Sequence, residues 1–302
     1  MDEAEKKNIK TDITKLSQQL GIPVAAHRHG AYTFLGFDPS LEITCRNGEM
    51  RAGCLHFPTA DPSAYLRQVL EEHKSPRFDH LPPFTGGLVG YFSYDYLGYS
   101  EPSVRAEVED SEEFRDLDLM LFDKVIAFDH LRQKLILMVN MSLDEPEQHN
   151  KAVLELRQLV ELLRTGAKKQ DRAGRLLGPV TPLFGREDFC RMVEQAKATP
   201  EGDIFQIVLS NCLSAPFEGS LFNTYRVLRT LNPSPYMFYF SGTDVGAGAS
   251  PETLVKLERR APHLPSRGYR PRGKTLEEDQ VLETELLSDE KELAEHNMLV
   301  DL

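Results

Sequence analysis

Gly202-Asp203-Ile204-Phe205-Gln206-Ile207-Val208-Leu209-Ser210 opens the stretch in which turn residues, charges and apolar runs lie closest together. The apolar run Ile204 to Leu209 predicts a strand. Residues 221–231 then place apolar side chains on one helix face, with Ser220 as a candidate N-cap. The turn 232–235 (Asn-Pro-Ser-Pro) ends that helix, and an aromatic strand follows from Tyr236. This order indicates a mixed domain of helices and strands.

The last part of this stretch predicts helix to the end of the chain. Thr275-Leu276-Glu277-Glu278 matches a capping box, and a break is expected near Ser288-Asp289. The pattern stops at Leu302 without a C-cap or a stop signal. We therefore expect this domain to be incomplete.

The upstream half predicts strands and helices in irregular alternation. Two β-rich runs, Leu117 to Phe128 and Leu131 to Met141, are expected to form one hairpin. The other predicted elements are helices over 2–20, 62–73, 146–164 (ended by Gly166) and 186–198, and strands over 31–37, 41–46 and 86–95.

Residues 167–178 are basic, contain glycine and lack periodicity, and we expect a linker over 167–184. The expected domains are therefore 1–166 and 185–302.

Composition excludes several classes of protein. A net charge of −12 argues against a nucleic-acid partner, which would require clustered Lys and Arg. No apolar run approaches the roughly 18 residues of a membrane span, so we expect a cytoplasmic protein with no membrane partner. The four cysteines have neither zinc-site nor disulfide-scaffold spacing, and reduced, mostly buried thiols are expected.

Charged residues near the C-terminus have two interpretations each. Glu292 and Glu295 lie three apart on a predicted helix, and two such carboxylates commonly hold Mg²⁺. The alternative is a solvated acidic face beside Lys291. Arg270 and Arg272 are either a clamp for a carboxylate or a charged surface turn. His296 is similarly either a base or a structural histidine.

Taken together, the motifs resemble the large subunit of anthranilate synthase (component I), a chorismate-utilising enzyme. The segments that carry this resemblance are GDIFQIVLS (202–210), LNPSPYMFY (231–239), ASPETLVK (249–256), RPRG (270–273) and KELAEHNMLVDL (291–302). Weaker matches upstream are YTFLGFDP, GGLVGYFSYD and FDKVIAFDH.

The resemblance implies a fold and a reaction. The expected fold is α+β, with two facing antiparallel β-sheets wrapped by helices and an active site in the cleft between them. The expected reaction is that of a lyase, which converts chorismate and ammonia to anthranilate and pyruvate in tryptophan biosynthesis. A glutamine amidotransferase subunit would supply the ammonia, and Mg²⁺ would anchor the substrate's ring carboxylate.

The resemblance also implies site residues. Glu295 matches the family's Mg²⁺ ligand, with Glu292 as a neighbour. Gly268 and Tyr269 lie where the family contacts chorismate. Pro235, Tyr236 and Met237 fall on the site at which L-tryptophan exerts feedback inhibition. The family's catalytic histidine lies beyond Leu302, so no catalytic residue is assigned and the activity of this chain is in doubt.

Two further departures bear on function. Arg267 and Tyr269 replace small residues of the family's pocket, and the Leu-Leu-Glu-Ser element of the tryptophan site is missing upstream of Tyr32. Aminodeoxychorismate and isochorismate synthases carry Lys at the Arg267 position, which disfavours those relatives because Arg is a poor base or nucleophile. The alternatives are a non-catalytic remnant that binds tryptophan or the amidotransferase subunit, or another chorismate enzyme such as aminodeoxychorismate synthase.

Overall fold

The structure is a computed structural model that forms two compact units, Met1–Thr230 with Tyr239–Ala247 and Leu231–Phe238 with Gly248–Leu302. It describes residues 32–78, 80–104, 113–145, 147–167, 172–198, 207–242, 245–251, 253, 255, 257–258, 261–262 and 275–301. The helix expected over 2–20 lies outside the described residues. Each unit is considered by itself.

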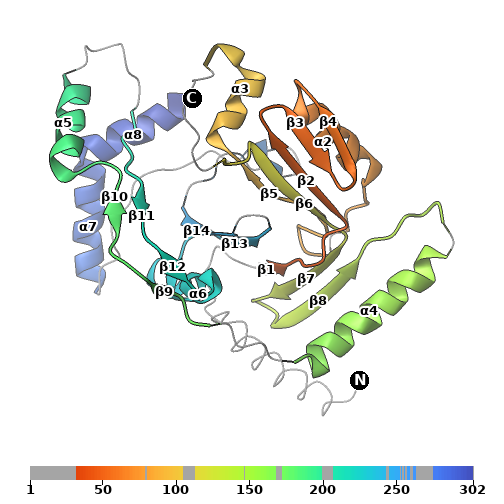
Figure 1. The fold of residues 1–302 in the computed structure, drawn as a ribbon. Coiled ribbons are helices and arrows are strands. Elements are labelled where there is room, and N and C mark those ends of the chain that lie inside the picture. The colour runs from red at the N-terminus through yellow and green to blue at the C-terminus, as the bar shows by residue number, and fades with distance from the viewer. Residues whose placement is uncertain are drawn as a thin grey trace. The chain divides into compact units, whose positions relative to one another are not determined.

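A five-stranded antiparallel sheet is the main element of the first unit, with the strand order β4-β3-β2-β6-β5 (Figure 1). Its strands are β2 (Leu41–Arg46), β3 (Glu49–Ala52), β4 (Leu55–Pro58), β5 (Gly87–Phe92) and β6 (Leu117–Phe122). Asn47 and Gly48 connect β2 to β3 with φ angles of 50° and 79°. An Asn-Gly pair suits such a turn, so this hairpin could have been predicted from the sequence. Our sequence analysis missed it.

Helix α2 (Pro62–Glu72), predicted over 62–73, covers one face of this sheet. Leu66 and Val69 of α2 join the buried residues Ile43, Met50 and Leu117 in one hydrophobic core. The 3-10 turns η1 (Tyr94–Tyr96) and η2 (Pro102–Val104) and the short helix α3 (Leu97–Ser100) follow β5. Tyr96 and Tyr99 from this segment also pack against the core.

The apolar run from Leu117 to Phe128 forms two strands in different sheets, so the prediction of one hairpin is wrong for this part. Strand β7 (Lys124–Asp129) lies between β1 (Tyr32–Leu35) and β8 (Lys134–Val139) in a three-stranded antiparallel sheet. The chain leaves the five-stranded sheet at Asp123, whose carbonyl accepts hydrogen bonds from the backbone and side chain of Asn140. The β7–β8 pairing confirms the second half of the predicted hairpin.

A second core joins these two sheets. It contains Met120 and Phe122 from β6, Val125 and Ala127 from β7, and Met138 from β8. Helix α4 (Gln148–Thr165) lies alongside β8 and buries Ala152 and Leu159 (Figure 1). Gly166 ends this helix, as predicted.

The later part of the first unit consists of short ribbons and two helices. Strand β9 (Arg175–Leu176) pairs with β12 (Phe217–Glu218), and β10 (Thr181–Pro182) pairs with β11 (Leu213–Ser214). The helices are α5 (Arg186–Lys197) and α6 (Leu221–Leu231), both close to the predicted bounds.

Two predictions concern this region: the linker over 167–184 and the strand over 204–209. Strands β9 and β10 lie within the expected linker 167–184, so that segment carries structure of its own; the division into domains 1–166 and 185–302 stays a prediction. Residues 204–206 of the predicted strand lie outside the described residues, and 207–210 form neither helix nor strand.

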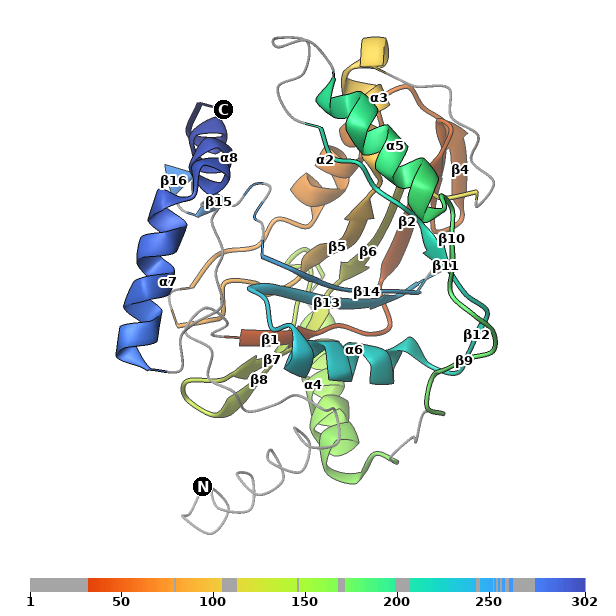
Figure 2. The ribbon, with the colours of Figure 1, turned by 90° about the vertical axis from the view of Figure 1, so that its left-hand side faces the viewer.

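Helices α7 (Leu276–Ser288) and α8 (Glu290–Asp301) end the second unit (Figure 2). The backbone N–H of Glu278 donates to Oγ1 of Thr275 at 3.2 Å, which confirms the predicted N-cap. The break between the helices is also where it was predicted, because Asp289 caps α8 through the N–H groups of Lys291 and Glu292. The short strands β15 (Leu257–Glu258) and β16 (Ala261–Pro262) precede them.

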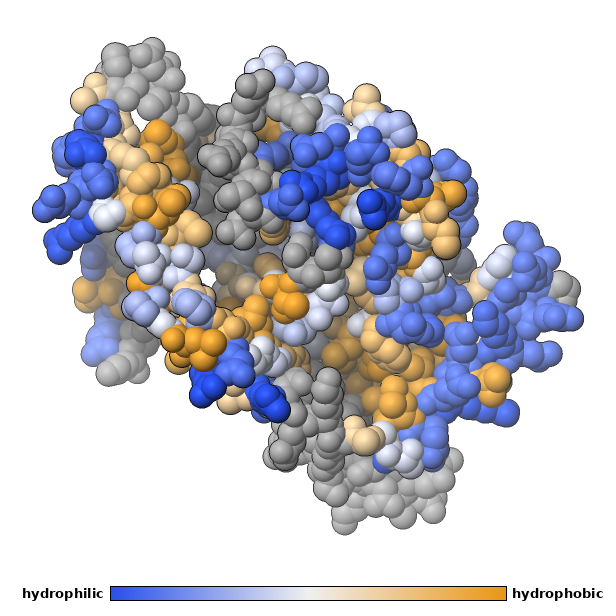
Figure 3. Space-filling view, viewed as in Figure 1, coloured by the Kyte–Doolittle hydropathy of each residue, from blue (hydrophilic) through white to orange (hydrophobic). Residues whose placement is uncertain are grey.

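Strands β13 (Tyr236–Ser241) and β14 (Val245–Ser250) form a two-stranded sheet, and the division between the two units falls within both strands. The buried hydrophobic residues of the described chain all lie between Ile43 and Leu159. None of the residues described between 172 and 301 is fully buried. Figure 3 shows hydrophobic residues at the surface of the face in view. The expected α+β class is nevertheless confirmed, because helices accompany antiparallel sheets.

Candidate functional site

The two candidate metal ligands lie on the less exposed face of α8. Glu292, Glu295 and His296 are partly buried, whereas Lys291 and Leu293 are exposed. Carboxylates on a surface helix usually point into water, so partial burial of two of them on one face is informative. A fully solvated acidic face does not describe this arrangement.

The chemistry of these side chains fits part of a Mg²⁺ site. Oε1 of Glu295 lies 3.7 Å from Nζ of Lys291, and that lysine is 79% exposed, so this ion pair is weak. Mg²⁺ is usually held by one or two carboxylates with water and substrate oxygens completing its shell. Across the described residues no group of three or more His, Cys, Asp or Glu side chains is arranged to hold a metal. The pair on α8 therefore offers two ligands and requires the remainder from elsewhere.

The three candidate tryptophan-binding residues lie where the turn after α6 enters β13. Pro235 is exposed, the Tyr236 ring is 38% exposed, and Met237 is partly buried. The N–H of Ser234 donates to Sδ of Met237 at 3.3 Å. The hydroxyl of Tyr236 lies 2.6 Å from Oγ1 of Thr253, a residue that the sequence analysis did not select.

Aromatic and basic side chains cluster where α6 packs against β13 in the first unit. Tyr239 contacts the rings of Phe222 and Tyr225, with centroids 5.3 and 5.9 Å away. The guanidinium of Arg229 lies 5.7 Å from the centroid of the Tyr225 ring. Burial lowers the pKa of Arg229 and raises the pKa of Tyr225, while the attraction between the two opposes both shifts.

His130 connects this cluster to the three-stranded sheet. Its Nε2 lies 2.7 Å from Oγ1 of Thr33, and its Nδ1 is buried without a hydrogen-bond partner. Burial lowers the pKa of His130, the positive charge of Arg229 lowers it further, and Asp129 opposes the shift. This environment therefore favours the neutral imidazole over the charged one. His130 is the last residue of the matching segment FDKVIAFDH, but nothing in that segment indicated this environment.

Several predicted site residues cannot be placed. Gly268 and Tyr269 of the candidate substrate site lie outside the described residues, as do Arg267, Arg270 and Arg272. Among the predicted site residues that the structure describes, Glu292 and Glu295 share one face of α8, and Pro235, Tyr236 and Met237 follow one another where the chain enters β13.

The four cysteines are free, as expected, but only Cys45 is buried. The prediction of mostly buried thiols is wrong because Cys54 lies in the β3–β4 turn, Cys190 on the solvent side of α5 and Cys212 just before the two-residue strand β11. In the described part of the chain, no helix is both long and apolar enough to cross a membrane.

Residues 23–302 match the family described as chorismate binding enzyme. The chain is 37% identical over 296 residues to anthranilate synthase component 1 of Acetivibrio thermocellus, and 38% identical over 290 residues to that of Aquifex aeolicus. Each alignment covers 90% of this chain and 58% of the relative. The crystal structure of anthranilate synthase component I from Streptococcus pneumoniae is similar, with a TM-score of 0.74 and 33% identity.

The resemblance drawn from the motifs is thus confirmed, and so is the fold that it implied. The structural alignment covers 90% of this chain and 60% of the Streptococcus protein. The chain therefore spans about three fifths of the length of the proteins that it matches.

Proposed function

Because the chain belongs to the family of chorismate-binding enzymes, we propose that it serves as the large subunit of an anthranilate synthase. The observation that carries this proposal is the identity of 37–38% to anthranilate synthase component 1 over 90% of the chain. The proposed protein is a cytoplasmic lyase of tryptophan biosynthesis. A glutamine amidotransferase subunit would supply it with ammonia.

The proposed reaction first forms a C–N bond and then eliminates pyruvate. Ammonia adds to the chorismate ring with loss of the hydroxyl group as water, and the enolpyruvyl ether is then released as pyruvate to leave anthranilate. In our proposal Gly268 and Tyr269 contact chorismate. Pro235, Tyr236 and Met237 bind L-tryptophan as a feedback inhibitor.

Electrostatics explain why this site would use Mg²⁺. Chorismate carries two carboxylates, and the protein has a net charge of −12, so a cation is needed where substrate meets protein. Glu295, with Glu292 beside it, would hold the ion. When bound, Mg²⁺ supplies positive charge for the ring carboxylate of the substrate.

Titration calorimetry with chorismate, in the presence and absence of Mg²⁺, tests the metal site directly. We expect binding that requires Mg²⁺ and that falls at least about tenfold in Glu295→Gln, as for the loss of one charged ligand. Glu290→Gln is the matched control, since Glu290 is exposed on the same helix. Equal chorismate binding without Mg²⁺, or by Glu295→Gln, would contradict the proposed site.

Anthranilate fluorescence in the presence of chorismate, Mg²⁺ and ammonium salt tests turnover. Ammonium removes the need for the partner subunit. Anthranilate above the Glu295→Gln background supports the proposed reaction. Aminodeoxychorismate or isochorismate in its place would assign the chain to another reaction of the family.

A second candidate function is binding without turnover. Binding of tryptophan by calorimetry, together with no detectable anthranilate, would support this candidate.

A further inference from the structure

The hydrogen bond between Tyr236 and Thr253 joins the candidate tryptophan-binding turn to a second segment. The two oxygens are 2.6 Å apart, and the residues are seventeen positions apart in the chain. Both belong to the second unit. Tyr236 begins β13, and Thr253 follows the end of β14 at Ser250. Since only residues 242–244 connect these paired strands, the strands run antiparallel and their outer ends meet.

This contact fixes the direction of the tyrosine ring. The phenol is held at its far end by Thr253, while the backbone of the same turn is held by the bond from Ser234 to the sulfur of Met237. The side chain of Tyr236 is still 38% exposed, so part of it is accessible to a ligand. A tyrosine anchored at its hydroxyl loses less freedom when a ligand packs on it, and pre-organisation of this kind raises affinity.

We propose that Thr253 is a positioning residue for tryptophan binding at Pro235, Tyr236 and Met237. The inference rests on the proposed function, in which those three residues bind tryptophan. Thr253 acts through Tyr236: its hydroxyl keeps the phenol in the orientation that receives the indole ring. Loss of the hydroxyl at either end of the bond has the same consequence, because either change releases the ring.

A double-mutant cycle measured by calorimetry tests this inference. L-tryptophan is titrated into the 302-residue chain and into Thr253→Val, Tyr236→Phe and the double variant. We expect each single change to weaken binding roughly three- to tenfold, the range expected for one hydrogen bond. The double variant is expected to bind no more weakly than the weaker single variant, because both changes remove the same interaction.

Two further variants separate positioning from folding. Thr253→Ser keeps the hydroxyl and is expected to restore most of the affinity. Thr284→Val is the matched control, since Thr284 donates its hydroxyl hydrogen bond within α7, to the carbonyl of Gln280 in the same unit. Tryptophan affinity is expected to be unchanged in this control. Thermal unfolding of each variant checks that differences in binding do not reflect loss of the fold.

The possible results are distinct. Wild-type affinity in Thr253→Val, or additive losses in the double variant, would overturn the inference while leaving the tryptophan site in place. Absence of tryptophan binding by the wild-type chain would overturn both the inference and the tryptophan part of the proposed function. The chorismate titration judges the rest of the proposed function independently.

Discussion

The hydroxyl of Tyr99 lies 2.6 Å from Oδ2 of Asp116, to which it donates a hydrogen bond. The same phenol oxygen accepts a hydrogen bond from the backbone N–H of Gly48 at 2.6 Å. Asp116 also accepts from the N–H of Asn47 at 2.7 Å. Burial raises the pKa of Tyr99, and the hydrogen bonds to Asp116 and Cys45 raise it further. One tyrosine therefore ties α3, the β2–β3 turn and the start of β6 together.

We expect Tyr99→Phe to lower the free energy of unfolding by about 1–3 kcal/mol, because Asp116 and Gly48 each lose a partner in a partly buried place. Urea denaturation measures the change. Tyr94→Phe is the matched control: Tyr94 is 90% exposed, and we expect a change within about 0.5 kcal/mol. Equal unfolding midpoints for the two variants would refute this account of Tyr99.

Gly90 in β5 allows close approach of the neighbouring strand β6. A Cβ added at Gly90 would overlap the carbonyl oxygen of Asp118, whereas one added at Gly246 in β14 would have no atom within 4 Å. We expect Gly90→Ala to destabilise the protein by roughly 2 kcal/mol or more, because the obstacle is backbone. Gly246→Ala is the control and should be neutral or slightly stabilising. The urea midpoints of unfolding of the two variants measure these changes. A Gly90→Ala midpoint equal to that of the wild type would contradict the close approach of β5 and β6.

The buried imidazole of His130 predicts a dependence of stability on pH. Its pKa in the folded protein lies below the unfolded value of about 6.5, so the unfolded chain binds the additional proton first. Stability contributed by neutral His130 is thus present above about pH 6.5 and is lost as the pH falls toward the folded pKa. Two charged groups act on His130: Arg229 lowers its pKa further, and Asp129 raises it.

Urea unfolding of His130→Gln from pH 7.5 to 5 checks this prediction. The variant is expected to show a shallower loss of stability on acidification than the wild type. His149→Gln, a change at an exposed position on α4, is the control and should keep the wild-type slope. A wild-type slope in His130→Gln would contradict the assignment.

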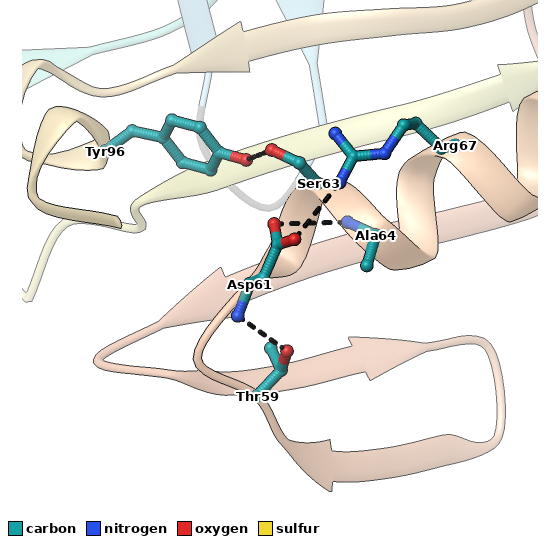
Figure 4. Close-up of polar contacts among 6 residues, drawn as sticks. All are labelled: Thr59, Asp61, Ser63, Ala64, Arg67 and Tyr96. Carbon is teal, nitrogen blue, oxygen red and sulfur yellow. Dashed lines mark hydrogen bonds and ion pairs between the residues drawn. The ribbon is translucent and has the colours of Figure 1, made fainter. Parts of the chain in front are cut away.

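Asp61 caps the first turn of α2 (Figure 4). Its Oδ1 accepts from the backbone N–H of Ala64 at 3.2 Å, and its Oδ2 accepts from Arg67 at 3.1 Å. Oγ of Ser63, in the same turn, lies 2.7 Å from the hydroxyl oxygen of Tyr96. We expect Asp61→Ala to cost about 0.5–2 kcal/mol, the usual loss for an N-cap.

Thermal or urea unfolding measures this loss, with Asp61→Asn as the comparison. Asparagine keeps the oxygen that caps the helix but removes the charge opposite Arg67. Since that ion pair is exposed on both sides, we expect Asp61→Asn to stay within about 1 kcal/mol of the wild type. Equal losses in both variants would assign the effect to the ion pair instead of the cap.

The candidate site could be predicted only where local sequence carries it. Glu292 and Glu295 share a helix face by spacing, and the structure places them on one partly buried face. Tyr236 was selected through the resemblance. Thr253 was not, because its contact with Tyr236 exists only after β13 and β14 have paired.

Of the helices in the described residues, the sequence by itself determined α2, α4, α5, α6, α7 and α8, whereas the four-residue helix α3 was not predicted. Asp61, Thr275 and Asp289 cap the starts of α2, α7 and α8, and Gly166 ends α4. Each of these residues acts on backbone groups within a few residues. Such interactions are local, so the pattern around them suffices to predict them.

Tertiary structure alone decided that β6 and β7 join different sheets. All six residues of β6 are buried, and so are five of the six in β7, so no alternation of polar and apolar residues marks the crossing at Asp123. Leu117, Leu119 and Leu121 pack into one core, and Met120 and Phe122 pack into the other. The division of this apolar run therefore depends on partners far away in the chain, which its own residues do not encode.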